Sequence, residues 1–241
     1  VQLHLEKAYK NFFRDPKIGF PRFKSKHHSR NSYTTNVVNG NILVESKRIR
    51  LPKLKWIAMK KHREPAEGLC LKSVTVSMEP SGKYFASLLY EGYSCENQAA
   101  EPDCSTARIL GIDYAMQGMA VFSEKIETEE AGFFRKNEKR LAREQRKLSR
   151  CVRGSHNYEL QKKKVARCHE KIRNQRRDYL HKLSRKIADG YDAVAVEDID
   201  MKAMGQCLHF GKSVHDNGYG MFREMIDYKL AWRGKKMVKV D

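Results

Sequence analysis

The chain has 241 residues, of which 40% are hydrophobic and 32% are charged. This composition is typical of a globular protein and excludes a disordered chain, a collagen-like chain and a membrane-embedded bundle. The sequence contains neither the roughly 18 uninterrupted apolar residues of a membrane span nor the apolar core of a signal peptide, so we expect a soluble, cytoplasmic protein.

The charge is strongly basic, with 48 Lys and Arg against 29 Asp and Glu and a net charge of +19. Residues 135–186 alone contain 20 basic and five acidic residues, so most of the excess lies in about a fifth of the chain. A solvated helix face is the ordinary interpretation of such a run, but this much like charge needs counterions and therefore favours a polyanionic partner. The six cysteines form no CxxC pair, and we interpret them as reduced thiols.

The first half of the chain predicts a short helix followed by an antiparallel β domain. Residues 3–14 have apolar side chains at spacings of three and four, and Asp15-Pro16 ends that pattern. Short alternating runs separated by turn residues predict a small barrel or sandwich; these strands are expected at 33–38, 41–44 after an Asn39-Gly40 turn, 71–78 and 84–90. All six prolines lie in the first 102 residues, and the polar stretch 91–106 is the candidate linker, which puts a domain boundary near residue 105.

The second half predicts an α/β domain with a mixed sheet. The elements expected there are a hairpin at 108–113 and 119–123, helices at 133–150 and 157–189, a strand at 193–196, a helix at 221–232 and a strand at 237–240. The run AVAV at 193–196 is apolar throughout, which favours a buried central strand over an alternating edge strand.

Two acidic residues lie where strands of this domain end. Asp113 ends RILGID, and Glu197 directly follows AVAV. Each alone is more often a turn former. If the two strands are neighbours, however, the carboxylates converge and repel each other unless a divalent cation lies between them, which is how a magnesium site for phosphodiester hydrolysis is built. Asp198 alternates away from Glu197, and Tyr114 is expected to pack on the other side of its strand.

Six segments in the same order give the chain a resemblance that runs nearly end to end. They are NFFRDPKIGFPRFKSK at 11–26, SYTT at 32–35, ILGIDYAMQGMAVFSE at 109–124, LHKLSRKIADGYDAVAVEDIDMKAM at 180–204, FGKSVHDNGYGMF at 210–222 and VKVD at 238–241. With these segments the sequence resembles the TnpB (OrfB) family of transposon-encoded, RNA-guided nucleases, which are relatives of the type V CRISPR effectors.

The resemblance implies a fold and a set of domains. It implies an α/β protein in which an RNase H-like (RuvC-like) nuclease domain follows a small antiparallel β-barrel of the wedge, oligonucleotide-binding type. The expected domains are residues 1–14 as the end of a helical recognition lobe, 15–105 as the wedge barrel and 106–241 as the nuclease domain, incomplete at its C-terminus. The family has a zinc-binding cysteine ribbon and a third catalytic Asp after the VKVD-like strand, so both, and the Zn²⁺, are expected beyond Asp241.

The resemblance also implies an activity. Asp113 and Glu197 match the first and second catalytic carboxylates and would bind Mg²⁺ for two-metal hydrolysis of DNA, in the context of transposition and DNA recombination. Guide RNA and DNA are the expected partners, in the nucleoid of a prokaryote, and base pairing would read most of the target sequence. We expect the activity in a longer parent protein, with the 241-residue chain inactive by itself.

Basic side chains in two regions are the candidates for nucleic-acid binding. The first region mixes charge with an aromatic ring, at Lys24, Lys26, Arg30 and Tyr33. The second follows the long helix, at Lys162, Lys163, Lys164, Arg173, Arg176, Arg177, Lys182, Arg185 and Lys186. Two other functions remain open: a catalytically silent nucleic-acid-binding protein derived from a transposon, and a ribosome-associated or architectural RNA-binding protein, which leaves the two acids unexplained.

Overall fold

The computed structural model describes residues 2–22, 31–92, 107–115, 119–126, 132–199 and 218–240. The chain divides into two compact units, Val1–Gly92 and Tyr93–Asp241. The predicted linker lies mostly outside the described residues, in 93–106. Each unit is described by itself.

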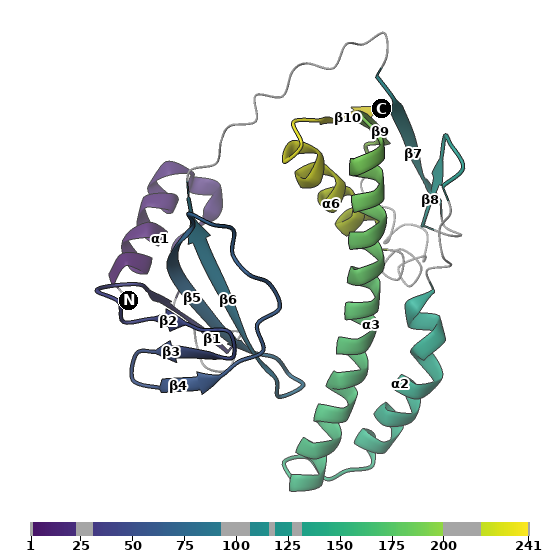
Figure 1. The fold of residues 1–241 in the computed structure, drawn as a ribbon. Coiled ribbons are helices and arrows are strands. Elements are labelled where there is room, and N and C mark those ends of the chain that lie inside the picture. The colour runs from purple at the N-terminus through teal and green to yellow at the C-terminus, as the bar shows by residue number, and fades with distance from the viewer. Residues whose placement is uncertain are drawn as a thin grey trace. The chain divides into compact units, whose positions relative to one another are not determined.

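The first unit begins with a helix and continues with two antiparallel sheets (Figure 1). Helix α1 (Gln2–Arg14) ends directly before Asp15, whose carboxylate accepts a hydrogen bond from the Lys17 amide at 3.0 Å at the start of the short 3₁₀ helix η1 (Pro16–Ile18). One sheet has the order β1-β5-β6, and the other has the order β2-β3-β4. The strands are β1 (Ser32–Asn36), β2 (Leu43–Val44), β3 (Arg48–Leu51), β4 (Lys55–Ala58), β5 (Cys70–Met78) and β6 (Tyr84–Glu91).

The two sheets of this unit share one apolar core. Ile49 and Leu51 of β3 are buried with Ile42 and with Val74 of β5, and partly buried apolar side chains of β5 and β6 pack around them. Side chains alternate along a strand, so the arginines of β3 lie on the opposite face of their sheet. The antiparallel β structure agrees with the expectation from the sequence, while closure into a barrel stays a prediction.

The Asn39-Gly40 turn connects two different sheets. Both of its residues have positive φ, 48° and 67°. A two-residue turn of this kind is typical of a hairpin, but β1 pairs with β5 and β2 pairs with β3. The side chain of Asn41 hydrogen-bonds to the backbone on the other side of the turn. Its amide oxygen accepts from the Val38 N–H at 2.9 Å, and its amide nitrogen donates to the Asn36 carbonyl at 3.3 Å.

The second unit has the mixed α/β architecture expected from the sequence. Its sheet has the order β10-β9-β7-β8, in which β7 and β8 are antiparallel and β9 is parallel to both β7 and β10. The strands are β7 (Ile109–Ala115), β8 (Met119–Phe122), β9 (Ala193–Glu197) and β10 (Lys236–Val240), and the helices are α2 (Phe133–Ser149), α3 (His156–Gly190) and α6 (Tyr219–Ala231). Helix α3 begins at a Ser155 cap, whose side chain accepts from the Tyr158 N–H at 3.1 Å.

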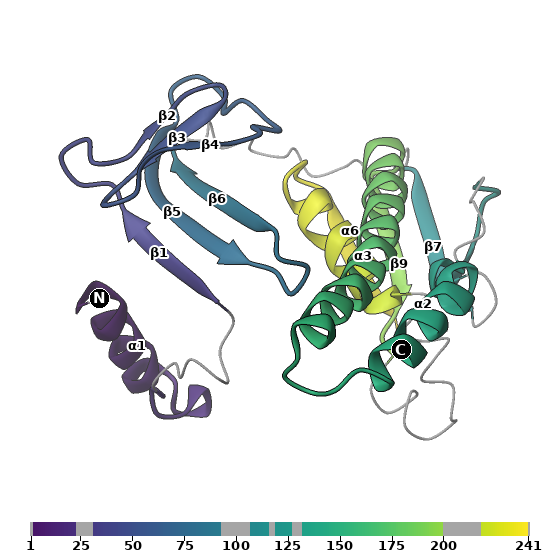
Figure 2. The same cartoon turned by 90° about the horizontal axis from the view of Figure 1, so that it is seen from below.

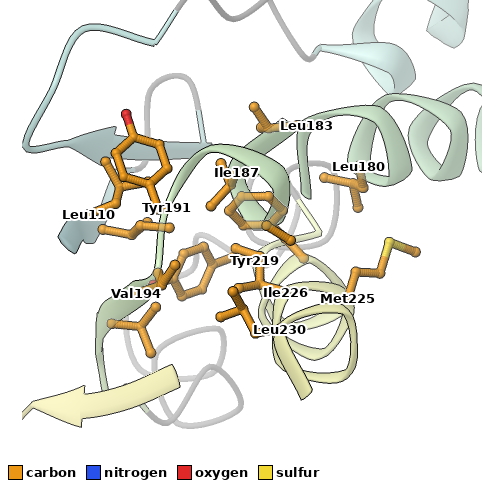
Figure 3. Close-up of a cluster of buried hydrophobic side chains, with 14 residues drawn as sticks. Leu110, Leu180, Leu183, Ile187, Tyr191, Val194, Tyr219, Met225, Ile226 and Leu230 are labelled. Atoms are coloured by element: carbon orange, nitrogen blue, oxygen red, sulfur yellow. The ribbon is translucent and has the colours of Figure 1, made fainter. Parts of the chain in front are cut away.

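Helices α3 and α6 cover one face of this sheet, as Figure 3 shows. The central strands contribute the fully buried Leu110 and Val194, and α6 contributes Ile226 and Leu230. Between the two helices, the buried Lys229 ammonium donates to the Ser184 hydroxyl at 2.6 Å and to the His181 carbonyl at 2.8 Å, so this buried charge has polar partners.

Polar contacts stabilise the register of the sheet at the end where β7 and β9 begin. The Arg108 side chain binds Glu124 at 2.5 Å and lies 4.6 Å from the centre of the Tyr191 ring, and the Tyr191 hydroxyl donates to Glu124 at 2.9 Å. Lys235 donates to the Ala188 and Tyr191 carbonyls at the end of α3. These contacts connect β7, β8, α3 and β10 and set the strand positions on which the site depends.

Candidate functional site

The parallel pairing of β7 with β9 brings the two predicted carboxylates to one edge of the sheet. The register pairs Ile112 with Val196, so Asp113 and Glu197 are the next residues on neighbouring strands. Leu110, Ile112, Val194 and Val196 face the helices, and the period-two alternation places both acids on the other face, where each is exposed. The condition that the sequence left open, that the two strands are neighbours, is met.

The two carboxylates interact directly. The hydrogen bond with Asp113 raises the pKa of Glu197, and burial and the negative charge of Asp113 raise it further. Neither acid forms an ion pair with a basic side chain among the residues that the structure describes. The raised pKa means that Glu197 holds a proton more readily than a lone glutamate does.

Asp198, the next acidic residue, has a different environment. Its carboxylate binds Arg223 at 3.1 Å and Lys239 at 3.4 Å, and its N–H donates to the Val240 carbonyl at 3.0 Å. Asp198 therefore connects β9 to β10 and α6 and is already neutralised. This matches the expectation that it points away from Glu197.

Two tyrosines pack behind the acids. Tyr114 contacts Tyr219 with ring centroids 5.1 Å apart, in line with the packing role expected for Tyr114. Burial raises the pKa of Tyr219; the nearby Arg223 opposes this, and the charges of Asp113 and Glu197 add to it. Its hydroxyl is buried without a hydrogen-bond partner in the described part of the chain. Sequence reasoning missed Tyr219, because its position at the start of a helix gives no sign that it lies near the acids.

The paired acids fit a divalent cation. Mg²⁺ prefers oxygen ligands and is commonly bound by one or two carboxylates together with waters and substrate phosphates. Asp113 and Glu197 supply such a pair on an exposed sheet edge. In the ranges that the structure describes, no group of three or more His, Cys, Asp or Glu side chains gathers to hold a metal. The fit is therefore to a site with two protein ligands.

The basic region forms a helical hairpin of α2 and α3, which lie side by side (Figure 2). Leu141 of α2 is buried against Cys168 and Ile172 of α3. Gln161 donates to the Glu144 backbone carbonyl at 3.0 Å and to its carboxylate at 2.8 Å, which lowers the pKa of Glu144. The hairpin is thus a packed unit whose outer faces carry the charge.

The nine predicted contacts on α3 are not equivalent. Three are paired within the helix: Lys162 with Glu159 at 3.9 Å, Lys182 with Asp178 at 2.7 Å and Arg185 with Asp189 at 3.5 Å. Arg176 is only half-exposed, and its stem lies so close to Gly218 that a Cβ there would be 3.0 Å from the Arg176 Cδ. The exposed side chains without an ion pair in the described ranges are Lys163, Lys164, Arg177 and Lys186.

In the first unit, the structure describes one of the four predicted contacts. Tyr33 on β1 is 46% exposed. Lys24, Lys26 and Arg30 lie outside the described residues. The structure adds a basic surface that the sequence reasoning missed, on β3 and β4, where Arg48, Arg50 and Trp56 share one face. The alternation in RIRLPKLKWIA was its only signal.

Comparison with known proteins finds a matching family model and similar curated proteins. The family model OrfB_IS605, described as "Probable transposase", matches residues 92–207. The chain is 33% identical over 98% of its length to "Putative RNA-guided DNA endonuclease InsQ" of Escherichia coli (strain K12), covering 60% of that protein. It is 31% identical over 99% of its length to "Putative RNA-guided DNA endonuclease" of Streptomyces pristinaespiralis, covering 57% of it. The chain thus spans about 60% of the length of these curated relatives.

A solved structure shares the fold. It is the "Cryo-EM structure of the Cas12f1-sgRNA-target DNA complex", with a TM-score of 0.52 and 14% identity, covering 95% of this chain and 58% of that chain. At this identity the likeness concerns the fold alone. Among the described residues, no helix has the length and apolarity needed to cross a membrane.

Proposed function

The chain belongs to the TnpB (OrfB) family of transposon-encoded proteins, and from this premise we propose that its full-length protein is an RNA-guided, Mg²⁺-dependent DNA endonuclease. The second unit would be its RNase H-like (RuvC-like) nuclease domain, and the first would be its wedge barrel. The names of the two relatives and the fold shared with a guided effector support this proposal.

The observation that carries the proposal is the carboxylate pair. Asp113 and Glu197 are 84 positions apart in the chain, yet they contact each other at the ends of adjacent parallel strands. A structural acid is normally neutralised, as Asp198 is by Arg223 and Lys239. Two exposed acids that repel each other destabilise the fold, and such a pair is typical of a metal site.

In the proposed mechanism, Asp113 and Glu197 would hold Mg²⁺ through their carboxylate oxygens. Bound there, Mg²⁺ would supply activation of water and neutralisation of charge on the leaving oxygen of a phosphodiester. Tyr114 and Tyr219 pack behind the acids, and the ion pairs of Asp198 stabilise the ends of β9 and β10 beside them. These contacts support the strand ends that carry the carboxylates.

The partners in this proposal are a guide RNA and a DNA target. The hairpin of α2 and α3 presents exposed, unpaired Lys163, Lys164, Arg177 and Lys186 along a long helix, which suits contacts to successive phosphates. Phosphate contacts position a nucleic acid without reading its bases. Sequence recognition is therefore assigned to pairing between guide and target.

A second candidate is a catalytically silent nucleic-acid-binding protein derived from a transposon. One observation favours it: only two carboxylates meet at the proposed site in the described residues, whereas a two-metal centre commonly has a third. The basic hairpin would act in the same way in either protein.

Cleavage by the full-length natural protein, bound to its own transcript, tests the proposal. We expect Mg²⁺-dependent cleavage of duplex DNA that matches the guide, and its loss in Asp113→Ala and Glu197→Ala. The matched control is Asp227→Ala, which removes an exposed carboxylate of α6 and should cut at the parental rate. Parental cleavage by Asp113→Ala would refute the assignment. Guide-dependent DNA binding without any cleavage would instead support the silent protein.

A further inference from the structure

The outer face of the β2-β3-β4 sheet combines an exposed indole with guanidinium groups. The register pairs Arg50 with Trp56 and Arg48 with Ala58. Ile49 and Leu51 point into the core, so Arg48, Arg50 and Trp56 lie together on the opposite face. Neither the proposed active site nor the basic hairpin uses this face.

The side chains of this face are pre-positioned. The Arg48 guanidinium lies 4.6 Å from the centre of the Trp56 ring, within the range of a cation–π contact. Glu45 binds the Arg48 Nε at 2.5 Å and thereby restricts the guanidinium. Trp56 nevertheless remains 40% exposed. The ring is therefore oriented and still accessible.

The segment that contains Trp56 carries an excess of positive charge. Residues 45–64 contain eight Lys or Arg and two acids. Both acids are already paired, Glu45 with Arg48 and Glu64 with Lys61. The basic residues of this segment left without an ion pair in the described part of the chain are Lys47, Arg50, Lys53, Lys55, Lys60 and Arg63. The contact with Trp56 accounts for the position of Arg48 but for none of the other basic residues. The six without an ion pair indicate a polyanionic partner.

We propose that this face binds unpaired nucleotides of an RNA, with a base stacked on Trp56 and phosphates bound by Arg50 and by Lys53 of the adjoining turn. Every base offers an aromatic face, and a positive surface follows the backbone, which is the usual chemistry of single-strand binding. A folded RNA exposes unpaired bases in loops and bulges, whereas those of duplex DNA are stacked inside the helix. The inference rests on the proposed function in taking guide RNA as the partner, and it names where the RNA binds.

Tryptophan fluorescence reports this contact directly, because the chain has two tryptophans, Trp56 and Trp232. Trp232 is 73% exposed and lies on the second unit, so Trp232→Phe should leave the fold intact and make Trp56 the sole emitter. The probe is a 12-nucleotide single-stranded RNA without self-complementarity. We expect saturable quenching of Trp56, and weak quenching by a 12-base-pair RNA duplex that binds the same protein. Binding of the single strand without quenching would overturn the proposal.

Affinity measurements on variants of the 241-residue chain form the second arm. Loss of a stacked aromatic ring should weaken binding of the labelled single strand about fivefold or more in Trp56→Ala. Trp56→Phe should restore most of it, and Trp232→Ala is the matched control that should bind as the parent does. Arg50→Ala should lower the slope of log affinity against log salt by about 0.7. Circular dichroism checks folding in each case.

The contradicting results are distinct from a failure of the nuclease. Binding by Trp56→Ala within twofold of the parent, with its fold retained, would refute the inference. Equal quenching by single-stranded DNA of the same sequence would refute the commitment to RNA. If DNA cleavage is absent while Trp56 is quenched as expected, only the proposed active site fails.

Discussion

The contact between Lys229 and Ser184 makes a measurable contribution to stability. The ammonium is buried between α6 and α3 and donates at 2.6 Å to a hydroxyl that is itself fully buried. A hydrogen bond to a charged group contributes about 1.5–3 kcal/mol, and the second bond, to the His181 carbonyl, survives when the hydroxyl is removed. We therefore expect Ser184→Ala to lower the free energy of unfolding by about 2 kcal/mol.

A double-mutant cycle isolates this contact. In a Lys229→Met background the Ser184 hydroxyl contacts only backbone carbonyls of its own helix, at Leu180 and His181. Because such back-bonding is weak and alanine favours helix, Ser184→Ala should then cost less than about 0.5 kcal/mol. The assay is urea unfolding of all four proteins at pH 7, followed by circular dichroism. A coupling energy below about 0.5 kcal/mol would refute the reasoning.

Two further predictions concern the sheet. The raised pKa of Glu197 means that the folded state binds a proton more tightly than the unfolded chain does. Protonated Glu197 therefore contributes to stability below the ordinary glutamate pKa. This contribution is lost as the pH rises through the raised pKa. Asp113→Asn should remove this loss of stability. Urea unfolding of the parent and of Asp113→Asn between pH 4 and 7, without divalent cations, measures it. Parallel pH profiles of the two proteins would contradict the coupling between Asp113 and Glu197. Leu110→Ala should lower the free energy of unfolding by about 3 kcal/mol, because the side chain is fully buried between the sheet and the helices. The neighbouring Ile109 is 57% exposed, so Ile109→Ala should change the free energy of unfolding by no more than about 0.5 kcal/mol. Thermal unfolding compares the two, and equal losses would contradict the assignment of the core face.

The helices could be predicted closely from the sequence. The expected helix at 157–189 differs by one residue at each end from α3 (His156–Gly190). Its apolar stripe and the cap at Ser155 are local signals that tertiary packing does not override. The mixed α/β order of the second unit could be predicted for the same reason.

Strands β3 and β4 were not predicted. Pro52 interrupts the run that contains both, and a proline within an alternating run argues against a strand. Here it lies in the turn between β3 and β4, where no ladder hydrogen bond is lost. The face that carries Trp56 was missed as a result.

The two acids of the site could be predicted from the sequence, but the pairing of the strands that carry them could not. Asp113 and Glu197 are recognisable because each follows an apolar run. Which strands pair depends on the packing of α3 and α6 on the sheet and on contacts such as that of Lys235 with the end of α3. Local propensity does not encode these long-range contacts.

The parallel alignment of β7 with β9 has a consequence for the order of events during biosynthesis. Parallel neighbours require a crossover, and here it contains the whole basic hairpin, so residues 113 and 197 meet only after more than eighty intervening residues have been made. Contacts so distant along the polymer are entropically slow to close, whereas the hairpin needs only local contacts. A nascent chain can therefore form its basic hairpin before it can bring its two acids together.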